Sequence, residues 1–384
     1  MEEASLSFMR ERFREYYSRE QIELPYRFGK REFAFMPFGA KLMKRHLSFR
    51  KREEFLEYIK KMVPAHVYYS SAFYQNPGAP TMDEKGWMGA ELIFDLDLDH
   101  LEKRKIRSYE DGLRVVKEEF IRLINEFLIE DFGFDEKYIK LYFSGGRGYH
   151  CHVMDPRVFS LDSSERREIV DYIIGNEIEE DSIFRKVTIR SPEGSRSITR
   201  LEIPRSDEPG WRGRVGRGII ELIRNIDRED FLEGMGIKKK DIERLRKELT
   251  DDRIKRIERG LIDQSKFIRR FFLRTSIKKL SISSVAGETD EPVTCDIKRL
   301  IRLPTSLHGK TGFRVCEIDL DKIEDFDPLH DAVVFGDDLI RVELKERFRI
   351  RMKGEDFDLD RGANKVPEYL AIFLVGRGIA KVIN

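Results

Sequence analysis

Cysteine is scarce in this chain. Its 384 residues include 3 cysteines, and Cys151, Cys295 and Cys316 lie far apart in the sequence. No Cys-x-x-Cys pair occurs, so we expect neither a disulfide framework nor a tetrahedral thiolate zinc site. Cysteine usage of this kind is typical of a reducing compartment. The sequence therefore predicts a cytoplasmic protein that binds no zinc.

Long apolar runs and an excess of one charge are also absent. No stretch of about 18 apolar residues indicates a membrane span. The first residues are charged from Glu2 onward and lack the apolar segment of a secretion signal. Lys and Arg number 72 against 71 Asp and Glu, which gives a net charge of +1. A surface for a polyanion must therefore arise from local segregation of charge.

Alternation of apolar and acidic residues marks the segment 91–100, which reads ELIFDLDLDH. A period of two predicts a half-buried strand. At a rise of ~3.3 Å per residue, Asp95 and Asp97 would lie ~6.6 Å apart on one face, where both could reach a divalent cation. The alternative is an edge strand with a solvated acidic face.

A second motif, SGGRGYH, spans residues 144–150 and follows a predicted strand. Glycines allow backbone N–H groups to approach an anion closely. Arg147 offers a planar fork for phosphate, and Ser144 and His150 add donors. A plain hairpin turn is the alternative interpretation.

The third motif, RLIRLPTSLHGK, follows Asp290 and supplies three phosphate-seeking side chains, Arg302, His308 and Lys310. Asp290 could complete a metal-binding triad with Asp95 and Asp97. Alternatively, it belongs to the start of a helix, expected from about Thr294 to the residue before Pro304, with a surface loop beyond. Three carboxylates and a set of phosphate-binding cations together are the groups that two-metal nucleotidyl transfer needs.

These motifs, in this order, resemble the catalytic small subunit of archaeal and eukaryotic DNA primase, in its archaeal branch. The similarity rests on KGWMGAELIFDLDLDH, SGGRGYH and DEPVTCDIKRLIRLPTSLHGKTG and extends over nearly the whole chain. It implies that catalysis depends on Mg²⁺ or Mn²⁺ held by Asp95, Asp97 and Asp290. It also implies nucleotide contacts from Ser144, Arg147, His150, Arg302, His308 and Lys310.

The fold implied by the resemblance is α/β (α+β). It is a primase catalytic core with mixed sheets, part of it related to the RNA-recognition motif. The core is expected in residues 1–159 and 279–384, with an inserted, mostly helical subdomain at 160–278. Within the insertion, four arginines near glycines are either solvated surface or contacts to a phosphate backbone: Arg205, Arg212, Arg214 and Arg217.

The expected activity is template-directed nucleotidyl transfer that makes short primers on single-stranded DNA from nucleoside triphosphates. The expected partner is a primase large subunit. Two alternatives are a related polymerase used in DNA repair or gap filling, and a single-strand-binding module with a vestigial site. The chain departs from the family at Gly146, where many members carry a second arginine. It also lacks the zinc knuckle that many archaeal members insert after the aspartate strand.

Overall fold

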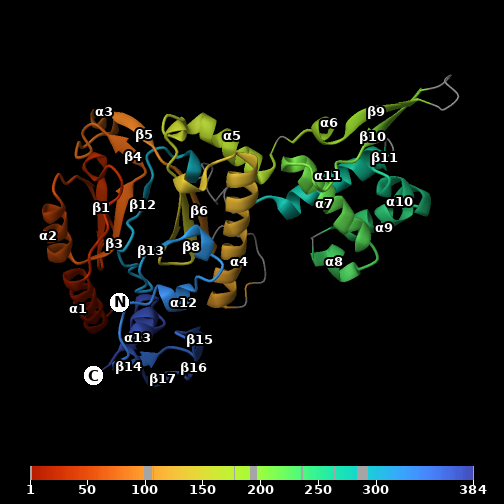
Figure 1. Ribbon diagram of the computed structural model, residues 1–384. Helices are drawn as coiled ribbons and strands as arrows, with labels where there is room; N and C mark the ends of the chain where they lie inside the picture. Colours follow the sequence, from red (N-terminus) through yellow and green to blue (C-terminus); the bar gives the residue numbers. More distant parts are fainter. Residues whose placement is uncertain are drawn as a thin grey trace. The chain divides into compact units, whose positions relative to one another are not determined.

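The computed structural model describes residues 2–98, 106, 108–176, 178–190, 197–234, 237–262, 265–282 and 293–383. The chain forms two compact units (Figure 1). The first comprises Met1–Ile124, Phe134–Arg167 and Ser284–Asn384, and the second comprises Asn125–Gly133 and Glu168–Ser283. Most of the segment 160–278 falls in the second unit, which also takes in Asn125–Gly133, most of it part of the π-helix Leu123–Asp131.

Two four-stranded sheets form the centre of the first unit. The aspartate sheet has the strand order β13 (Cys316–Ile318), β7 (Ile139–Phe143), β8 (Gly148–Val153) and β6 (Leu92–Asp97). The β3 sheet has the order β12 (Leu300–Arg302), β3 (Pro64–Ser70), β1 (Phe33–Pro37) and β2 (Lys44–Leu47). The helices of this unit are α1 (Glu3–Arg19), α2 (Arg52–Met62), α3 (Met82–Lys85), α4 (Tyr109–Arg122), α12 (Pro328–Asp331) and α13 (Glu368–Gly376).

Smaller sheets complete the first unit. They are β4 (Ala72–Tyr74) with β5 (Trp87–Ala90), β15 (Phe348–Met352) with β16 (Glu355–Leu359), and the order β17 (Gly362–Pro367), β14 (Leu339–Leu344), β18 (Ala380–Val382). The α+β class is confirmed. Every strand pair in the described residues is antiparallel, so these sheets are not mixed. Tight turns such as the one between β7 and β8 can join only antiparallel neighbours.

The aspartate strand has two different faces, as its alternation predicts. Leu92, Phe94 and Leu96 are fully buried, whereas Asp95 and Asp97 on the other face are half-buried. Helix α4 covers the apolar face, beside β6 and β8 in Figure 1. Its N-cap is Ser108, whose hydroxyl accepts a hydrogen bond from the Asp111 N–H at 3.1 Å. The two carboxylates are therefore presented on a rigid, well-packed strand.

The helix expected from about Thr294 is wrong. Val293–Cys295 is a single 3-10 turn, and β12 follows, with Ile301 paired opposite Tyr69 of β3. Ile301 is buried while its neighbours in the strand are half-buried, which is the alternation of a strand. Pairing with the open edge of β3 therefore decided the local structure, because tertiary context outweighs local propensity in short segments.

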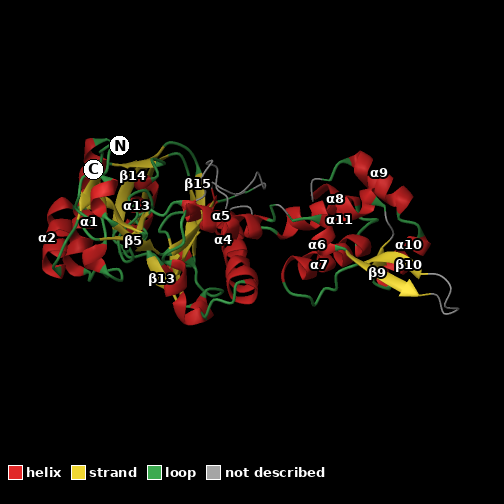
Figure 2. Cartoon of the chain, turned by 90° about the horizontal axis from the view of Figure 1, so that it is seen from above, coloured by secondary structure: helices red, strands yellow, loops and turns green. Residues whose placement is uncertain are grey.

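The second unit is mostly helical. Helix α5 (Ser163–Ile174) begins in the first unit and ends in the second, which contains α6 (Glu180–Ile183), α7 (Gly210–Arg224), α8 (Glu229–Gly234), α9 (Lys239–Glu248), α10 (Asp251–Glu258) and α11 (Lys266–Leu280) (Figure 2). A small sheet has the order β11 (Leu261–Ile262), β10 (Ser197–Glu202), β9 (Arg185–Arg190). Across the described residues, no helix is long and apolar enough to cross a membrane.

Two of the arginines near glycines serve the interior of this unit. Arg214 is 1% exposed, donates to Asp131 Oδ2 at 2.6 Å and lies over the ring of Phe127 at 3.8 Å. Arg212 donates to Glu208 Oε2 at 2.6 Å within the turn that starts α7. Both guanidinium groups are held by internal acceptors, and the side chains of Arg214 and Arg212 are 1% and 10% exposed, so neither solvated surface nor a phosphate contact describes this pair.

Candidate active site

Strand pairing places the aspartates beside the strand that leaves the glycine loop. In the register of β6 and β8, Asp95 lies opposite His150 and Asp97 lies opposite Gly148. His150 Nε2 lies 3.3 Å from Asp95 Oδ1, and His150 is 4% exposed. Its Nδ1 is buried and has no hydrogen-bond partner in the described structure. Asp95, Asp97 and His150 thus share one face of the aspartate sheet.

The glycine loop is closed by the hydroxyl of Ser144. Ser144 Oγ accepts hydrogen bonds from the N–H groups of Gly146 at 3.2 Å and Gly148 at 3.3 Å. Gly148 has no room for a side chain, because a Cβ atom there would lie 2.3 Å from the Leu96 carbonyl oxygen. Ser144, which was predicted to donate a hydrogen bond to phosphate, therefore also fixes the conformation of the loop that carries Arg147.

His308 and the glycine loop are in direct contact. Thr311 Oγ1 donates to the Gly145 carbonyl at 2.5 Å and lies 3.1 Å from His308 Nδ1. Because the single hydroxyl hydrogen of Thr311 points to Gly145, Nδ1 of His308 carries the ring hydrogen and donates a hydrogen bond to Thr311 Oγ1. Burial lowers the pKa of His308 well below its usual value, with a further contribution from Arg302. His308 is therefore neutral, and its Nε2 is an acceptor rather than a ready proton donor.

His66 on β3 holds Arg302 and the His308 loop together. Its Nδ1 accepts hydrogen bonds from Arg302 NH1 at 2.7 Å and from the Gly309 N–H at 3.2 Å. Burial lowers the pKa of His66 to about 2, and repulsion from Arg302 and Lys310 adds to the effect. Its ring also meets that of His308 edge to face at 4.8 Å. Only a neutral His66 can accept both bonds, so the low pKa and the geometry agree.

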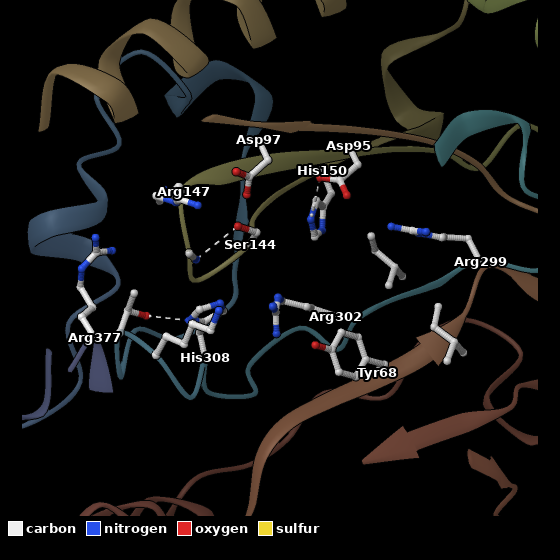
Figure 3. A pocket seen from close by; sticks show the side chains of 15 residues that line it. Tyr68, Asp95, Asp97, Ser144, Arg147, His150, Arg299, Arg302, His308 and Arg377 are labelled. Atoms are coloured by element: carbon white, nitrogen blue, oxygen red, sulfur yellow. Dashed lines mark hydrogen bonds and ion pairs between the residues drawn. The ribbon is translucent and has the colours of Figure 1, made fainter. Parts of the chain in front are cut away.

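These elements enclose one polar cavity of about 470 Å³. Figure 3 shows Asp95, Asp97 and His150 pointing from the aspartate sheet into a space that Arg302 and Tyr68 border on the opposite side. Five cations line the cavity with the two carboxylates: Arg147, Arg299, Arg302, Lys310 and Arg377. An excess of cations over carboxylates in one cavity suits a polyphosphate with its metal.

All described residues of the expected site line this cavity, whereas Asp290 lies outside the described residues. Among the described residues, no group of three His, Cys, Asp or Glu side chains is placed to hold a metal ion. Asp95 and Asp97 offer hard oxygen donors from one face of a strand, which fits Mg²⁺ or Mn²⁺. The zinc-free expectation also stays a prediction; Cys151, Cys295 and Cys316 are buried free thiols.

Comparisons with known proteins show the family of the chain. The family model described as "DNA primase small subunit" matches residues 94–320. The chain is 42% identical to the DNA primase small subunit PriS of Methanothrix thermoacetophila, over the full length of both chains. It is 43% identical to that of Methanocella arvoryzae over 99% of each chain, and 42% identical to that of Methanococcoides burtonii over 97% of each. This chain belongs to the DNA primase small subunit family.

Several residues of this primase site were not expected from the sequence. Besides His66, they include Tyr68, whose ring lies 5.0 Å from the Arg302 guanidinium carbon, and Arg377 at the end of α13. Arg377 lies over the ring of Tyr109 at 4.8 Å, and Tyr109 donates a hydrogen bond to the Gly146 carbonyl. They lie far from the motifs in sequence, and no local pattern marks them. Only the fold brings them to the primase cavity.

Proposed function

We propose that this primase small subunit is a catalytic subunit that makes short primers on single-stranded DNA by template-directed nucleotidyl transfer. The observation that carries the proposal is the cavity itself. Two aspartates on one strand line the same cavity as Arg302 and Lys310, and this combination suits a nucleoside triphosphate. A partner large subunit, by analogy with the family, would complete the enzyme.

The side chains divide into carboxylates and phosphate-binding groups. Asp95 and Asp97, with Asp290, would hold Mg²⁺ or Mn²⁺, which would activate the primer 3′-hydroxyl and offset charge on the departing pyrophosphate. Arg147, Arg302 and Lys310 bind and orient the triphosphate through charged hydrogen bonds. His66 keeps the Arg302 fork in place.

His308 is neutral before nucleotide binds, so it must take up a proton before it can act as a proton donor. Its Nε2 is unprotonated in the nucleotide-free cavity because burial and neighbouring cations lower its pKa. A bound triphosphate brings several negative charges next to Nε2, and nearby negative charge raises a histidine pKa. His308 would therefore become protonated on binding and then stabilise the pyrophosphate as it leaves.

A primer-synthesis assay tests the proposal. The chain, alone and with its large subunit, is incubated with a bare single-stranded DNA template, nucleoside triphosphates and Mg²⁺ or Mn²⁺. We expect short products that depend on both template and metal. Chain extension only from a supplied primer would favour the gap-filling alternative. Template binding without incorporation would favour a vestigial site.

Variants of the two aspartates test the role of the carboxylates. Asp95→Asn and Asp97→Asn keep size and hydrogen-bonding capacity but remove negative charge. We expect both to abolish incorporation and to remove the rise in melting temperature that metal with nucleotide produces in the unaltered chain. Wild-type incorporation by both variants would contradict the assignment of these carboxylates.

A further inference from the structure

The second unit carries a basic surface that does not belong to the candidate active site. Helices α9 and α11 border a cavity of about 630 Å³, here named the α9–α11 patch. Seven of its twelve lining residues are Lys or Arg, and a single one, Asp241, is acidic. Because the whole chain is balanced at 72 basic and 71 acidic residues, the patch is a local segregation of charge.

Helix α11 supplies most of this charge in a regular row. Four of its six cations line the patch and recur every fourth residue, at Lys266, Arg270, Arg274 and Lys278. This spacing puts them on one face of the helix, about 6 Å apart along its axis. Across the cavity, α9 contributes Lys240 and Arg244, again four residues apart. Two rows of cations therefore flank the same hollow.

Aromatic rings line the same cavity as the two rows of cations. Phe267 and Phe271 follow each other on α11, are half-buried, and have centroids 5.9 Å apart with an interplanar angle of 42°. The Arg244 guanidinium lies 3.9 Å from the centre of the Phe267 ring. The patch thus combines cations with partly accessible ring faces, and a row of cations alone would not provide flat surfaces for stacking.

Several of these cations form no ion pair with a carboxylate of the described residues. In the part of the chain that the structure describes, no ion pair joins Lys240, Arg274 or Lys278 to a carboxylate. By contrast, Arg244 pairs with Glu248 at 2.8 Å and Arg270 with Glu180 at 3.6 Å. Like charges one helical turn apart are destabilising. An external polyanion would relieve that repulsion.

We propose that the α9–α11 patch binds single-stranded nucleic acid, with backbone phosphates on the two rows of cations and bases stacked on Phe267 and Phe271. Cations that follow the backbone, combined with aromatic platforms for bases, are how proteins hold single strands without reading sequence. A duplex keeps its base faces inside its own stack, and an acidic polypeptide has few flat faces. The inference concerns a surface outside the catalytic cavity and does not require the proposed catalytic function.

The test uses the full chain and a fluorescein-labelled oligodeoxythymidylate. Anisotropy titrations at several salt concentrations give the affinity and the slope of log K against log salt. In Lys240→Glu/Arg274→Glu/Lys278→Glu, we expect an affinity about tenfold lower or more. Each lost phosphate contact on a single strand should reduce the steepness of this negative slope by about 0.7, so the loss of three contacts should reduce it by about two. An unchanged slope would overturn the proposal.

The contribution of the rings is measured separately. Phe271→Leu keeps an apolar side chain for the half-buried position but removes the stacking face. We expect affinity to fall about five- to a hundredfold, as for the loss of one stacked base, with the salt slope unchanged. An unchanged affinity for the oligonucleotide would overturn the stacking part of the proposal and, with it, the choice of a single strand.

A matched control removes the same charge elsewhere in the second unit. Lys247→Glu/Lys255→Glu/Arg259→Glu alters three exposed residues that do not line the patch. We expect its affinity to stay within about twofold of the unaltered chain in moderate salt, because screened charges away from the contact contribute little. An equal loss in both triple variants would show only diffuse attraction and would refute a built surface.

Two further measurements identify the ligand of the patch and test its binding separately from the proposed catalytic activity. Duplex DNA or polyglutamate that binds as tightly as the oligonucleotide, with no effect of Phe271→Leu, would assign the patch to that ligand and overturn ours. The titrations are repeated in an Asp95→Asn/Asp97→Asn background without metal. We expect the patch variants to lose affinity there as well, so binding at the patch is tested even if nucleotidyl transfer is not found.

Discussion

One nitrogen atom of His66 organises the phosphate-binding side of the cavity. Nδ1 accepts from both Arg302 and the Gly309 N–H, so its loss would release an arginine fork and a backbone turn together. In His66→Leu we expect the KM for nucleoside triphosphate to rise about ten- to a hundredfold. This corresponds to the ~1.5–3 kcal/mol of a hydrogen bond to a charged group. Nucleotide-incorporation kinetics measure the change.

His66→Asn is the matched control for that prediction, because the asparagine oxygen can take the place of Nδ1 as an acceptor. We expect it to recover most of the lost affinity, while His66→Leu and His66→Asn keep similar kcat values. If the two variants behaved alike, His66 would serve packing only.

Arg147 and His308 should respond differently to truncation. Arg147 is half-buried at the edge of the cavity, so Arg147→Ala should raise the KM about ten- to a hundredfold with an unchanged melting temperature. His308 is 7% exposed and bonded to Thr311, so His308→Ala should also lower the melting temperature. Melting curves beside the kinetics separate the two effects. Equal melting temperatures for both variants would contradict the packing role of His308.

The sequence predicted the residues that lie in motifs and missed those that the fold brings to them. Asp95 and Asp97 could be assigned to one face because strand periodicity is a local property. His308 was predicted as a phosphate-binding side chain from its motif, but its burial against Gly145 and His66 was not predicted. His66 and Arg377 were missed because their positions depend on contacts between distant segments, which a single sequence does not reveal.

The glycine loop shows how an element is shaped by what packs against it. Gly145 has a φ of +75°, and a Cβ atom there would lie 2.8 Å from His308 Cβ. Gly354, in the turn between β15 and β16, has a φ of +80° with nothing within 4 Å of such an atom. A non-glycine residue would therefore have a strained backbone at either position, but only at Gly145 would its side chain also lack space.

Alanine at each position separates these two effects. Gly354→Ala should cost about 1–2 kcal/mol of unfolding free energy, the usual penalty of a left-handed non-glycine residue, and leave incorporation intact. Gly145→Ala should cost more and abolish incorporation, because His308 and the loop must move apart. Urea unfolding with incorporation assays gives both numbers. Equal costs and retained activity in Gly145→Ala would refute the close packing of the two loops.

Elements with strong periodicity were predictable, and those defined by pairing were not. The aspartate strand and the Ser108 cap of α4 follow from local patterns. The sequence predicts a helix where β12 forms, because three residues are too few to show an alternating pattern and pairing with the edge of β3 decides their structure. The α9–α11 patch was not predicted, because the sequence alone does not show which helices border the same cavity.

At the scale of the whole molecule, histidine is confined to one unit. All 7 histidines fall within the ranges of the first unit, and the second contains none. Burial lowers the pKa of His66, His152 and His308, which favours their neutral forms in the folded protein. The chain also has 2 tryptophans, Trp87 in the first unit and Trp211 in the second. Each unit therefore carries its own fluorescent reporter.

This distribution predicts that acid weakens the two units differently. Below the unfolded histidine pKa of about 6.5, the unfolded chain binds protons that the folded first unit excludes, so its stability falls as the pH falls. Each buried neutral histidine makes its full contribution to the stability of the first unit above that pH. Below it, the contribution decreases by up to about 1.4 kcal/mol per pH unit for each histidine, and for His66 the decrease continues toward its folded pKa of about 2.

Between about pH 7 and 5, we expect the urea midpoint reported by Trp87 in Trp211→Phe to fall. The midpoint reported by Trp211 in Trp87→Phe should hold until carboxylates titrate near pH 4. In the Trp211→Phe background, His66→Asn should lessen the fall of the urea midpoint between pH 7 and 5. A Trp87 midpoint independent of pH in this range would show that the buried histidines do not govern the acid stability of the first unit.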